Sequence, residues 1–320
     1  MAKVALFGST GQIGRSIVRG LLNENHNVVQ VVRPASKSKA EDIAVPLDQK
    51  KRLTTVTLDV AEASVDELAS ALDGVYAVVS ALNGKGLDAQ VKIQDAADKA
   101  GVKRFYPSEY GLHHTYTDEK GYGQVHPAWN QKAEANRKAL HHPAIAAGRM
   151  TYTLIGCGDF YDQDREPIWC PWTQRDAPSY DVHILGSADY PIDFTNIGDL
   201  GAFLAATISN PKASENKTLN FVSDRISYND LVALWEKKSG KKVNKVFYPI
   251  ETMDRAWKNP EDIPPAVKSK SPFPDDFWMI VKGMQGLGRF WRPPGEVHND
   301  VFPEVKVTTF EQYFDNLFGK

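Results

Sequence analysis

The first half of the chain alternates short apolar runs with amphipathic stretches. Apolar positions at helical spacing predict helices at Gln12–Asn23, Val65–Leu72 and Leu87–Ala100. The apolar runs between them are short and bounded by turn residues, which predicts buried strands at Lys3–Phe7, Asn27–Val32, Leu53–Leu58, Val75–Leu82 and Val102–Pro107. This alternation predicts an α/β fold in which a parallel sheet carries helices on both faces.

Local signals mark where several of these helices begin and end. Ser64 and Glu67 have the spacing of a capping box, and Gly74 follows the end of the same helix. Gly101 follows the next helix in the same way. Farther along, Ser227–Ser239 reads as another capped helix, with Asp230 at its third position and Gly240 beyond its end.

The pattern loosens after about residue 150. A strand at Thr151–Ile155, a helix at Gly198–Ile208 and a strand at Leu219–Val222 are predicted to extend the same sheet. The stretches 157–182 and 250–305, rich in Pro, Trp and Asp, are predicted to be loops and short helices over one end of it. We therefore expect a Rossmann-like, doubly wound domain from residues 1–156, with 195–225 returning to its sheet. A smaller C-terminal substrate-binding region would comprise 157–194 and 226–320.

Composition narrows the class of protein. Of 320 residues, 42% are hydrophobic and 24% charged, which is typical of a globular protein, and the formal net charge of −2 argues against nucleic acid or an anionic membrane as partner. The two cysteines, Cys157 and Cys170, are too few for a disulfide framework. The opening MAKVALFGSTG reads as a buried strand rather than a signal peptide, and no apolar run is long enough for a membrane helix. These features predict a cytoplasmic protein.

The stretch FGSTGQIGR places Gly8, Gly11 and Gly14 between the first strand and the first helix. Backbone N–H groups at a helix N-terminus attract phosphate, and glycine lets that backbone approach it closely. The alternative is a tight turn without a ligand. The spacing G-x-x-G-x-x-G differs from the common G-x-G-x-x-G and resembles the short-chain dehydrogenase/reductase superfamily.

The second strand ends in Arg33, with Lys37 close behind, where an NAD site usually carries an acidic residue. A guanidinium can bind the 2′-phosphate of NADP(H), which a carboxylate would repel. The predicted cofactor is therefore NADP(H), although Arg33 is also compatible with a solvated strand end. The predicted cofactor-binding residues, taken from the glycine loop and the strand ends, are Gly8, Thr10, Gly11, Gln12, Ile13, Gly14, Arg33, Lys37, Asp59, Ser80, Ala81, Leu82, Pro107, Ser108 and Lys132.

Hydride transfer needs a proton donor or acceptor near the nicotinamide. Tyr116 and Lys120 have the Tyr-x-x-x-Lys spacing of most short-chain reductases, but they lie in a glycine-studded loop, where a chance match is the simpler reading. Lys132 lies on the helix predicted to begin at Pro127. From the residues alone, Lys132 is either a surface lysine or an acid or base whose pKa burial has lowered.

The run AGVKRFYPSEYG resembles the A-G-V-K-R-F-x-P-S-E-F-G signature of the isoflavone-reductase-like and NmrA-like proteins. The resemblance extends over most of the chain, through Arg33, the helix from Lys132 to Arg137, Ile197-Gly198-Asp199 and the terminal FPEVKVTTFEQYF. It implies that Lys132 replaces the Tyr-Lys pair as the catalytic residue. It also implies an NADPH-dependent reductase acting on an apolar aromatic metabolite, as in phenylcoumaran benzylic ether reductases, pinoresinol reductases and eugenol synthases of plant secondary metabolism. The other branch implies a non-catalytic NADP(H) sensor that acts through protein partners.

The regions expected to surround the substrate depart from the plant pattern: the loop 112–126, the segment 160–180 and the stretch 255–300. His126 is either a second proton-transfer group or a solvated or capping loop residue. The tryptophans, all beyond residue 128, either line the substrate site or pack the core. No metal site is expected, and the chain is expected to be a monomer or homodimer. The predicted substrate-binding residues are Glu109, Tyr110, His126, Phe160 and Trp169.

Overall fold

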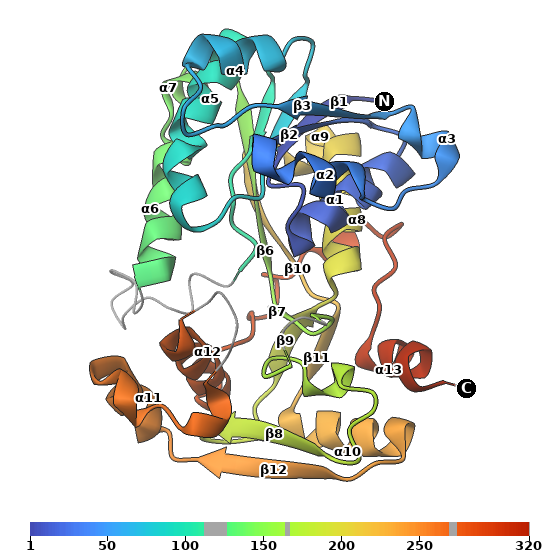
Figure 1. The fold of residues 1–320 in the computed structure, drawn as a ribbon, viewed down its shortest axis with the longest axis vertical. Helices are drawn as coiled ribbons and strands as arrows, with labels where there is room; N and C mark the ends of the chain where they lie inside the picture. Colours follow the sequence, from blue (N-terminus) through green and yellow to red (C-terminus); the bar gives the residue numbers. More distant parts are fainter. Residues whose placement is uncertain (112–126, 164–166, 269–273, 320) are drawn as a thin grey trace.

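The computed structural model describes residues 1–111, 127–163, 167–268 and 274–319, and a seven-stranded sheet dominates its N-terminal part (Figure 1). All strand pairs in this sheet are parallel, in the order β10-β6-β5-β4-β1-β2-β3. The predicted doubly wound parallel sheet is confirmed, including the return of a late strand to it. The strands are β1 (Lys3–Phe7), β2 (Asn27–Val32), β3 (Leu53–Thr57), β4 (Ala77–Ser80), β5 (Arg104–Tyr106), β6 (Thr151–Cys157) and β10 (Lys217–Phe221).

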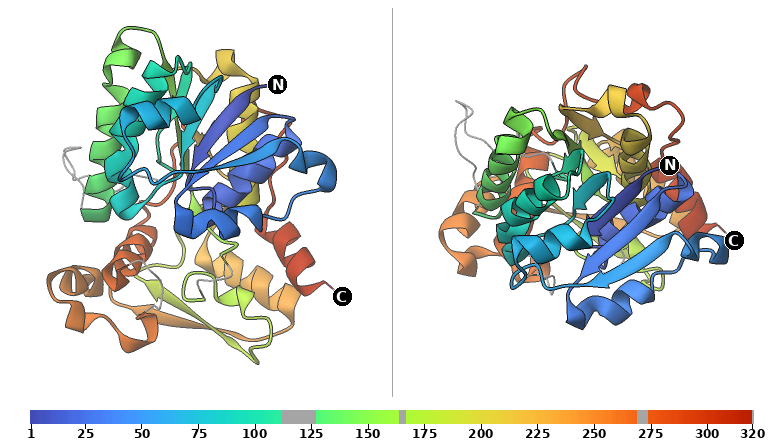
Figure 2. Two further views of the ribbon diagram at one scale, coloured as in Figure 1. Left: turned by 45° about the horizontal axis from the view of Figure 1, so that its top comes forward. Right: turned by 90° about the horizontal axis from the view of Figure 1, so that it is seen from above.

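Helices cover both faces of the sheet (Figure 2). On one face, α1 (Gln12–Asn23) and α8 (Ile197–Ser209) pack so closely that a Cβ atom on Gly20 would lie 2.2 Å from the Gly201 carbonyl oxygen. The other face is covered by α4 (Val65–Ala71), α5 (Gln90–Lys99) and α6 (Pro127–Leu140). The connecting elements are η1 (Pro34–Ser36), α2 (Lys37–Glu41), α3 (Leu47–Lys50), η2 (Gly84–Ala89), α7 (Pro143–Ala146) and α9 (Pro211–Ser214).

The predicted helix ends are confirmed where the structure shows their caps. Ser64 accepts from the Glu67 N–H while the Glu67 carboxylate accepts from the Ser64 N–H, which completes the capping box before α4. Gly101 has φ +74° just beyond α5, in the left-handed region that favours glycine. The predicted helix at 87–100 begins later than expected, because residues 84–89 form the 3₁₀ turn η2.

A second, smaller group of elements lies below the main sheet in Figure 1. Strands β11, β9 and β7 form one sheet, and the parallel pair β12–β8 forms another. Their bounds are β7 (Asp159–Phe160), β8 (Tyr180–Leu185), β9 (Ile192–Thr195), β11 (Asp224–Ile226) and β12 (Val243–Tyr248). The helices are η4 (Pro171–Thr173), α10 (Tyr228–Ser239), α11 (Glu251–Lys258), η5 (Pro260–Asp262), η6 (Pro265–Val267), α12 (Asp275–Gly286), η7 (Asn299–Val301) and α13 (Phe310–Phe318).

The expectation of loops and short helices in 157–182 and 250–305 is wrong at β7, at the start of β8 and at α12. Helix α12 spans 12 residues, and every residue from Trp278 to Gly286 is buried. A helix buried all round has no polar stripe, so its sequence lacks the periodicity that marks a surface helix. Strand β7 has only two residues, too few for an alternation to be visible.

Most tryptophans serve the core of this smaller region. Trp172, Trp235 and Trp278 are fully buried, and the Trp172 and Trp235 rings meet edge to face at 5.5 Å between centroids. Trp257 is instead 40% exposed. The sequence left two interpretations open for the tryptophans, lining of the substrate site or packing of the core. For these three buried rings, core packing is confirmed.

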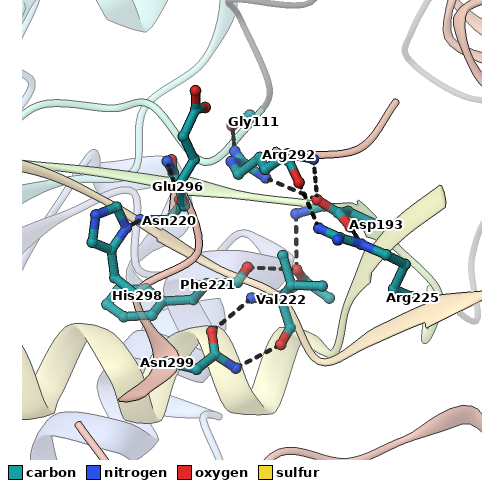
Figure 3. A network of polar contacts seen from close by, with 12 residues as sticks. Gly111, Asp193, Asn220, Phe221, Val222, Arg225, Arg292, Glu296, His298 and Asn299 are labelled. Atoms are coloured by element: carbon teal, nitrogen blue, oxygen red, sulfur yellow. Dashed lines mark hydrogen bonds and ion pairs between the residues drawn. The ribbon is translucent and has the colours of Figure 1, made fainter. Parts of the chain in front are cut away.

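The free edge of β10 is covered by the segment 296–299 (Figure 3). The Asn220 N–H donates to His298 Nδ1, and the His298 N–H donates back to the Asn220 carbonyl. The Asn299 side chain both donates to the Val222 carbonyl and accepts from its N–H. These bonds satisfy an edge that would otherwise offer unpaired backbone groups to another chain.

Among the described residues, no helix is both long and apolar enough to cross a membrane. In the same residues, no group of three or more His, Cys, Asp or Glu side chains is arranged to hold a metal ion.

Candidate functional site

Three glycines lie in the loop after β1 and the first turn of α1, and each is a glycine for a different reason. Gly8 has φ +88°, and a Cβ atom there would lie 2.5 Å from the Ala81 carbonyl oxygen. A Cβ on Gly14 would lie 2.1 Å from the Gly8 carbonyl oxygen. A Cβ on Gly11 would make only an ordinary contact of 3.5 Å, and its φ of −73° suits any residue. Packing thus explains Gly8 and Gly14, whereas Gly11 is explained by its N-cap position or by a ligand that approaches its backbone.

The N-terminus of α1 is open to an anion. Gly11 is its N-cap, no side chain caps it, and its first turn holds no acidic residue. The hydroxyls of Ser9 and Ser80 are buried beside this loop and have no hydrogen-bond partner among the described residues. Uncapped N–H groups and unused hydroxyls are the donors that a pyrophosphate needs, so the residues present fit a dinucleotide.

A cavity of about 460 Å³ adjoins this loop. Its lining includes Gly8, Thr10, Arg33, Asp59 and Leu82, all of which the sequence assigned to the cofactor. Residues from the ends of β1, β2 and β3 therefore meet at one site, as the parallel topology requires.

Arg33 immediately follows β2 and lines this cavity with an exposed side chain. Lys37 is not part of the lining, and its ammonium lies 3.9 Å from the Glu41 carboxylate on the exposed helix α2. Ser36 lines the cavity in its place. The geometry thus favours Arg33, rather than Lys37, for the role of binding a 2′-phosphate.

The turn after β5 comprises Pro107–Gly111 and is held in place by three hydrogen bonds. The Ser108 N–H donates to Gln90 Oε1 over 2.9 Å, and the Ser108 hydroxyl donates to the Leu82 carbonyl over 2.6 Å. The Tyr110 hydroxyl donates to the Ser80 carbonyl over 2.9 Å. Tyr110 also has φ +55°, a conformation rare for a non-glycine residue and common at functional sites.

Helix α6 places Lys132 against this turn. Lys132 Nζ donates to the Glu109 backbone carbonyl oxygen over 2.6 Å, and its side chain is half-buried rather than free on the surface. Burial lowers the pKa of Lys132 to about 8, with the neighbouring Cys157 thiol opposing the change. An ammonium with this pKa can give up its proton near neutral pH.

One turn farther along α6, Asn136 binds the side chain of the same glutamate. Asn136 Nδ2 donates to Glu109 Oε2 over 2.6 Å, and both side chains are buried. Glu109 therefore presents its neutral backbone oxygen to Lys132 and its carboxylate to Asn136. No sequence signal marks Asn136, because an Asn inside a helix usually faces solvent.

The remaining predicted residues lie in several environments. Gln12 lines a different groove, between α1 and α8, and Ile13 packs against the core. Ala81 borders Gly8, and Pro107 is buried. Phe160 packs against the core at the end of β7. Tyr116, Lys120 and His126 lie outside the described residues.

Trp169 lies beside a buried ion pair that the sequence did not predict. Lys282 Nζ is 2.9 Å from Asp159 Oδ2 and 5.2 Å from the centre of the Trp169 ring. Burial lowers the pKa of Lys282, but the attraction of Asp159 outweighs it, so the pKa is raised. The signal was present in the sequence as a single lysine inside the apolar run WMIVKGM.

Arg292 connects the smaller region to the turn that carries Glu109 (Figure 3). Arg292 Nη2 donates to the Gly111 carbonyl oxygen over 2.9 Å, and its backbone N–H donates to Asp193 Oδ2 over 2.8 Å. Asp193 is fully buried and also accepts from Arg225 Nε over 2.6 Å. The turn therefore has contacts with both groups of elements.

Comparison with known proteins gives a consistent result. The profile of the NmrA-like family matches residues 1–272. Phenylcoumaran benzylic ether reductase PT1 of Pinus taeda is 29% identical, covering 99% of this chain and 98% of that protein. A crystal structure of isoflavone reductase aligns with a TM-score of 0.74 at 25% identity, over 98% of this chain and 99% of that one.

A complex of AtPrR2 with NADP⁺ and (+)pinoresinol shares the fold, with a TM-score of 0.73 at 22% identity, over 99% of this chain and 98% of that one. The resemblance read from AGVKRFYPSEYG is thereby confirmed. The chain belongs to the NmrA-like family.

Proposed function

We propose that this chain is an NADPH-dependent reductase acting on an apolar, aromatic small molecule. The hydride acceptor is an unsaturated, benzylic or carbonyl carbon of that molecule. The observation that carries the proposal is the Lys132 ammonium, half-buried on α6 and bound to a neutral carbonyl oxygen. Relatives across the full length of the chain are named as reductases of phenylcoumaran benzylic ethers and isoflavones, which supports this class of substrate.

The dinucleotide is held by the loop Gly8–Gly14 and by the ends of the neighbouring strands. The N–H groups at the start of α1 bind its pyrophosphate, and Gly11 lets the backbone approach. Arg33 binds the 2′-phosphate, so NADP(H) is preferred over NAD(H). In this arrangement residues 1–156 with 195–225 form the cofactor-binding domain, and 157–194 with 226–320 bind the substrate.

Lys132 supplies the proton that reduction requires. When bound, NADPH provides a hydride, and the substrate atom that gains the electron pair must then be protonated. The Lys132 ammonium donates that proton and regains one from solvent, which balances the reaction. Since burial lowers the pKa of Lys132 to about 8, the group is mostly protonated at neutral pH yet readily gives up its proton.

An aromatic side chain shares the helix face of this lysine. Trp129 lies three residues before Lys132, on the same face of α6. The Trp129 and Phe277 ring centroids are 5.3 Å apart, and those of Trp169 and Phe277 are 6.0 Å apart. Trp129 and Trp169 are buried in the hydrophobic core of the smaller region, and the partly buried Phe277 packs against it, so this apolar core borders the helix that carries Lys132.

The test combines binding and turnover. NADPH and NADH affinities are measured by calorimetry, and NADPH oxidation is followed against aromatic enones, quinones and benzylic ethers, including (+)-pinoresinol. The proposal expects tighter binding of NADPH and turnover of at least one member of the panel. Tight NADPH binding with no turnover on any of them would contradict the reductase and favour a dinucleotide sensor acting through protein partners.

A further inference from the structure

A buried glutamine lies between the helix that carries Lys132 and the turn that carries its hydrogen-bond acceptor. Gln90 is the first residue of α5 and is fully buried. Its Oε1 accepts from the Ser108 N–H over 2.9 Å, and its Nε2 donates to the Ala135 carbonyl oxygen of α6 over 3.2 Å. One side chain therefore joins the Pro107–Gly111 turn to α6.

The two bonds together require an amide of this length. Ser108 offers a donor and Ala135 an acceptor, so the bridging group must accept at one atom and donate at another. A carbonyl oxygen has two lone pairs, which lets Ala135 accept from Gln90 as well as from its own helix. Packing alone does not call for an amide here, since Ile93 and Ala97 of α5 are buried in an apolar cluster.

This bridge lies next to the bond that orients Lys132. Lys132 is three residues before Ala135 on α6, and its Nζ donates over 2.6 Å to the carbonyl oxygen of Glu109, the residue after Ser108. The Gln90 bridge and the Lys132–Glu109 bond therefore connect the same helix to the same turn.

From this geometry we infer that Gln90 is a positioning residue for Lys132: it sets the separation of α6 from the turn and so holds the ammonium at the Glu109 carbonyl. The inference rests on the proposed role of Lys132 as the proton donor. A proton donor must lie within hydrogen-bond distance of the atom that it protonates, and a displacement of about 1 Å can cost about 10²-fold in rate. A buried amide whose oxygen and nitrogen are both bonded specifies one arrangement of its partners.

Gln94 provides a matched control on the same helix. It is also fully buried, and its Nε2 donates to the Ala139 carbonyl oxygen of α6 over 3.0 Å. Its Oε1 has no hydrogen-bond partner among the described residues, so this amide joins α5 to α6 without a bond to the turn. Gln90→Met and Gln94→Met each remove a buried bond between the two helices, but Gln90→Met also releases Ser108.

The test is a double-mutant cycle of Gln90 and Lys132 with the best substrate of the aromatic panel. Gln90→Met should lower kcat by about 10- to 100-fold, whereas Gln94→Met should stay near wild type. In the Lys132→Ala background, Gln90→Met should lower the remaining turnover little, because no ammonium is left to position. Single-turnover rates at high enzyme concentration make the slow variants measurable.

NADPH titration and thermal unfolding separate positioning from a general loss of the fold. Gln90→Met should bind NADPH with wild-type stoichiometry and near wild-type affinity, since the glycine loop and Arg33 are unchanged. The loss should then lie in kcat per bound cofactor. If Gln90→Met does not fold, Gln90→Asn serves in its place, because asparagine keeps the amide but is shorter by one CH₂ group and cannot span both bonds.

The inference and the proposed function fail in different ways. Unchanged kcat in folded Gln90→Met, or an equal fold-loss in the wild-type and Lys132→Ala backgrounds, would overturn the positioning role. Near-normal turnover in Lys132→Ala would instead contradict the catalytic role of Lys132, and the positioning role with it. A crystal structure of Gln90→Met should show Lys132 Nζ displaced from the Glu109 carbonyl oxygen, and an unchanged 2.6 Å bond would overturn the inference whether or not a substrate is found.

Discussion

Replacing Gly11 separates a ligand-binding loop from a simple tight turn. The backbone at Gly11 has φ −73° and ψ 169°, and an added Cβ would meet its nearest atom, the Gly8 carbonyl oxygen, at 3.5 Å. Gly11→Val should therefore fold, at a cost of about 1 kcal/mol or less from the poorer N-cap. Its branched side chain would stand where the backbone must approach the pyrophosphate.

The expected loss of affinity follows from the hydrogen bonds involved. Losing one charge-assisted bond to phosphate costs about 1.5–3 kcal/mol, or about 10- to 150-fold in affinity. Steric exclusion should raise the loss in Gly11→Val beyond that range.

Gly14→Ala is the contrasting variant. A Cβ there would lie 2.1 Å from the Gly8 carbonyl oxygen, so the backbone must shift. Overpacking of this kind costs about 1–3 kcal/mol, and each kcal/mol lowers the melting temperature of a chain of this size by about 1.5 °C. Gly14→Ala should thus lower the stability of the fold, whereas Gly11→Val should lower the affinity for NADPH.

The assay is NADPH calorimetry beside thermal unfolding of both variants. Folded Gly11→Val that still binds NADPH with wild-type affinity would refute the reasoning and show that the loop is only a turn. Strong unfolding of Gly11→Val would contradict the small stability cost expected from its ordinary 3.5 Å contact.

Three further predictions concern charge. Arg33→Ala should weaken the binding of NADPH by about 10- to 150-fold and have little effect on the binding of NADH, as measured by calorimetry. Equal affinities of the wild type for the two cofactors would contradict this prediction. Asp159→Asn leaves the Lys282 ammonium buried without its counter-charge and should lower the free energy of unfolding by about 3–5 kcal/mol, measured with denaturant. The double variant Asp159→Asn/Lys282→Met should recover most of this stability. Because Lys132 donates a proton in the reducing direction, kcat/KM should fall as the pH rises through about 8, where the ammonium is lost; a rise through that pH would assign Lys132 as a base.

The order of elements in the main sheet was predictable because its signals are local. Buried parallel strands read as apolar runs, and Ser64, Gly101 and Gly240 mark helix ends by their own conformational preferences. The glycine loop and Arg33 were predictable for the same reason, since each takes its meaning from its place at a strand end.

Contacts between distant segments were not predictable. Asn136 binds Glu109 across 27 positions, and Lys282 binds Asp159 across 123. No pattern in either segment reveals the partner. Tyr110 adopts the left-handed conformation although Gly111 follows it directly, because its hydroxyl and N–H are held by Ser80 and Ile155. The division into a cofactor domain and a substrate region stays a prediction, as do the oligomeric state and the role of His126.

Turnover by Lys132→Ala tests the central claim most directly. Lys138→Ala is the matched control, since Lys138 lies on the exposed face of α6 and pairs with Glu134 at 3.5 Å. With the best substrate of the aromatic panel, Lys132→Ala should lose about 10²–10⁴ in kcat while NADPH affinity falls much less, and Lys138→Ala should be near wild type. Lys132→Arg should also be poor, because guanidinium does not release its proton at working pH. Near-normal turnover in Lys132→Ala, with NADPH still bound, would contradict the account.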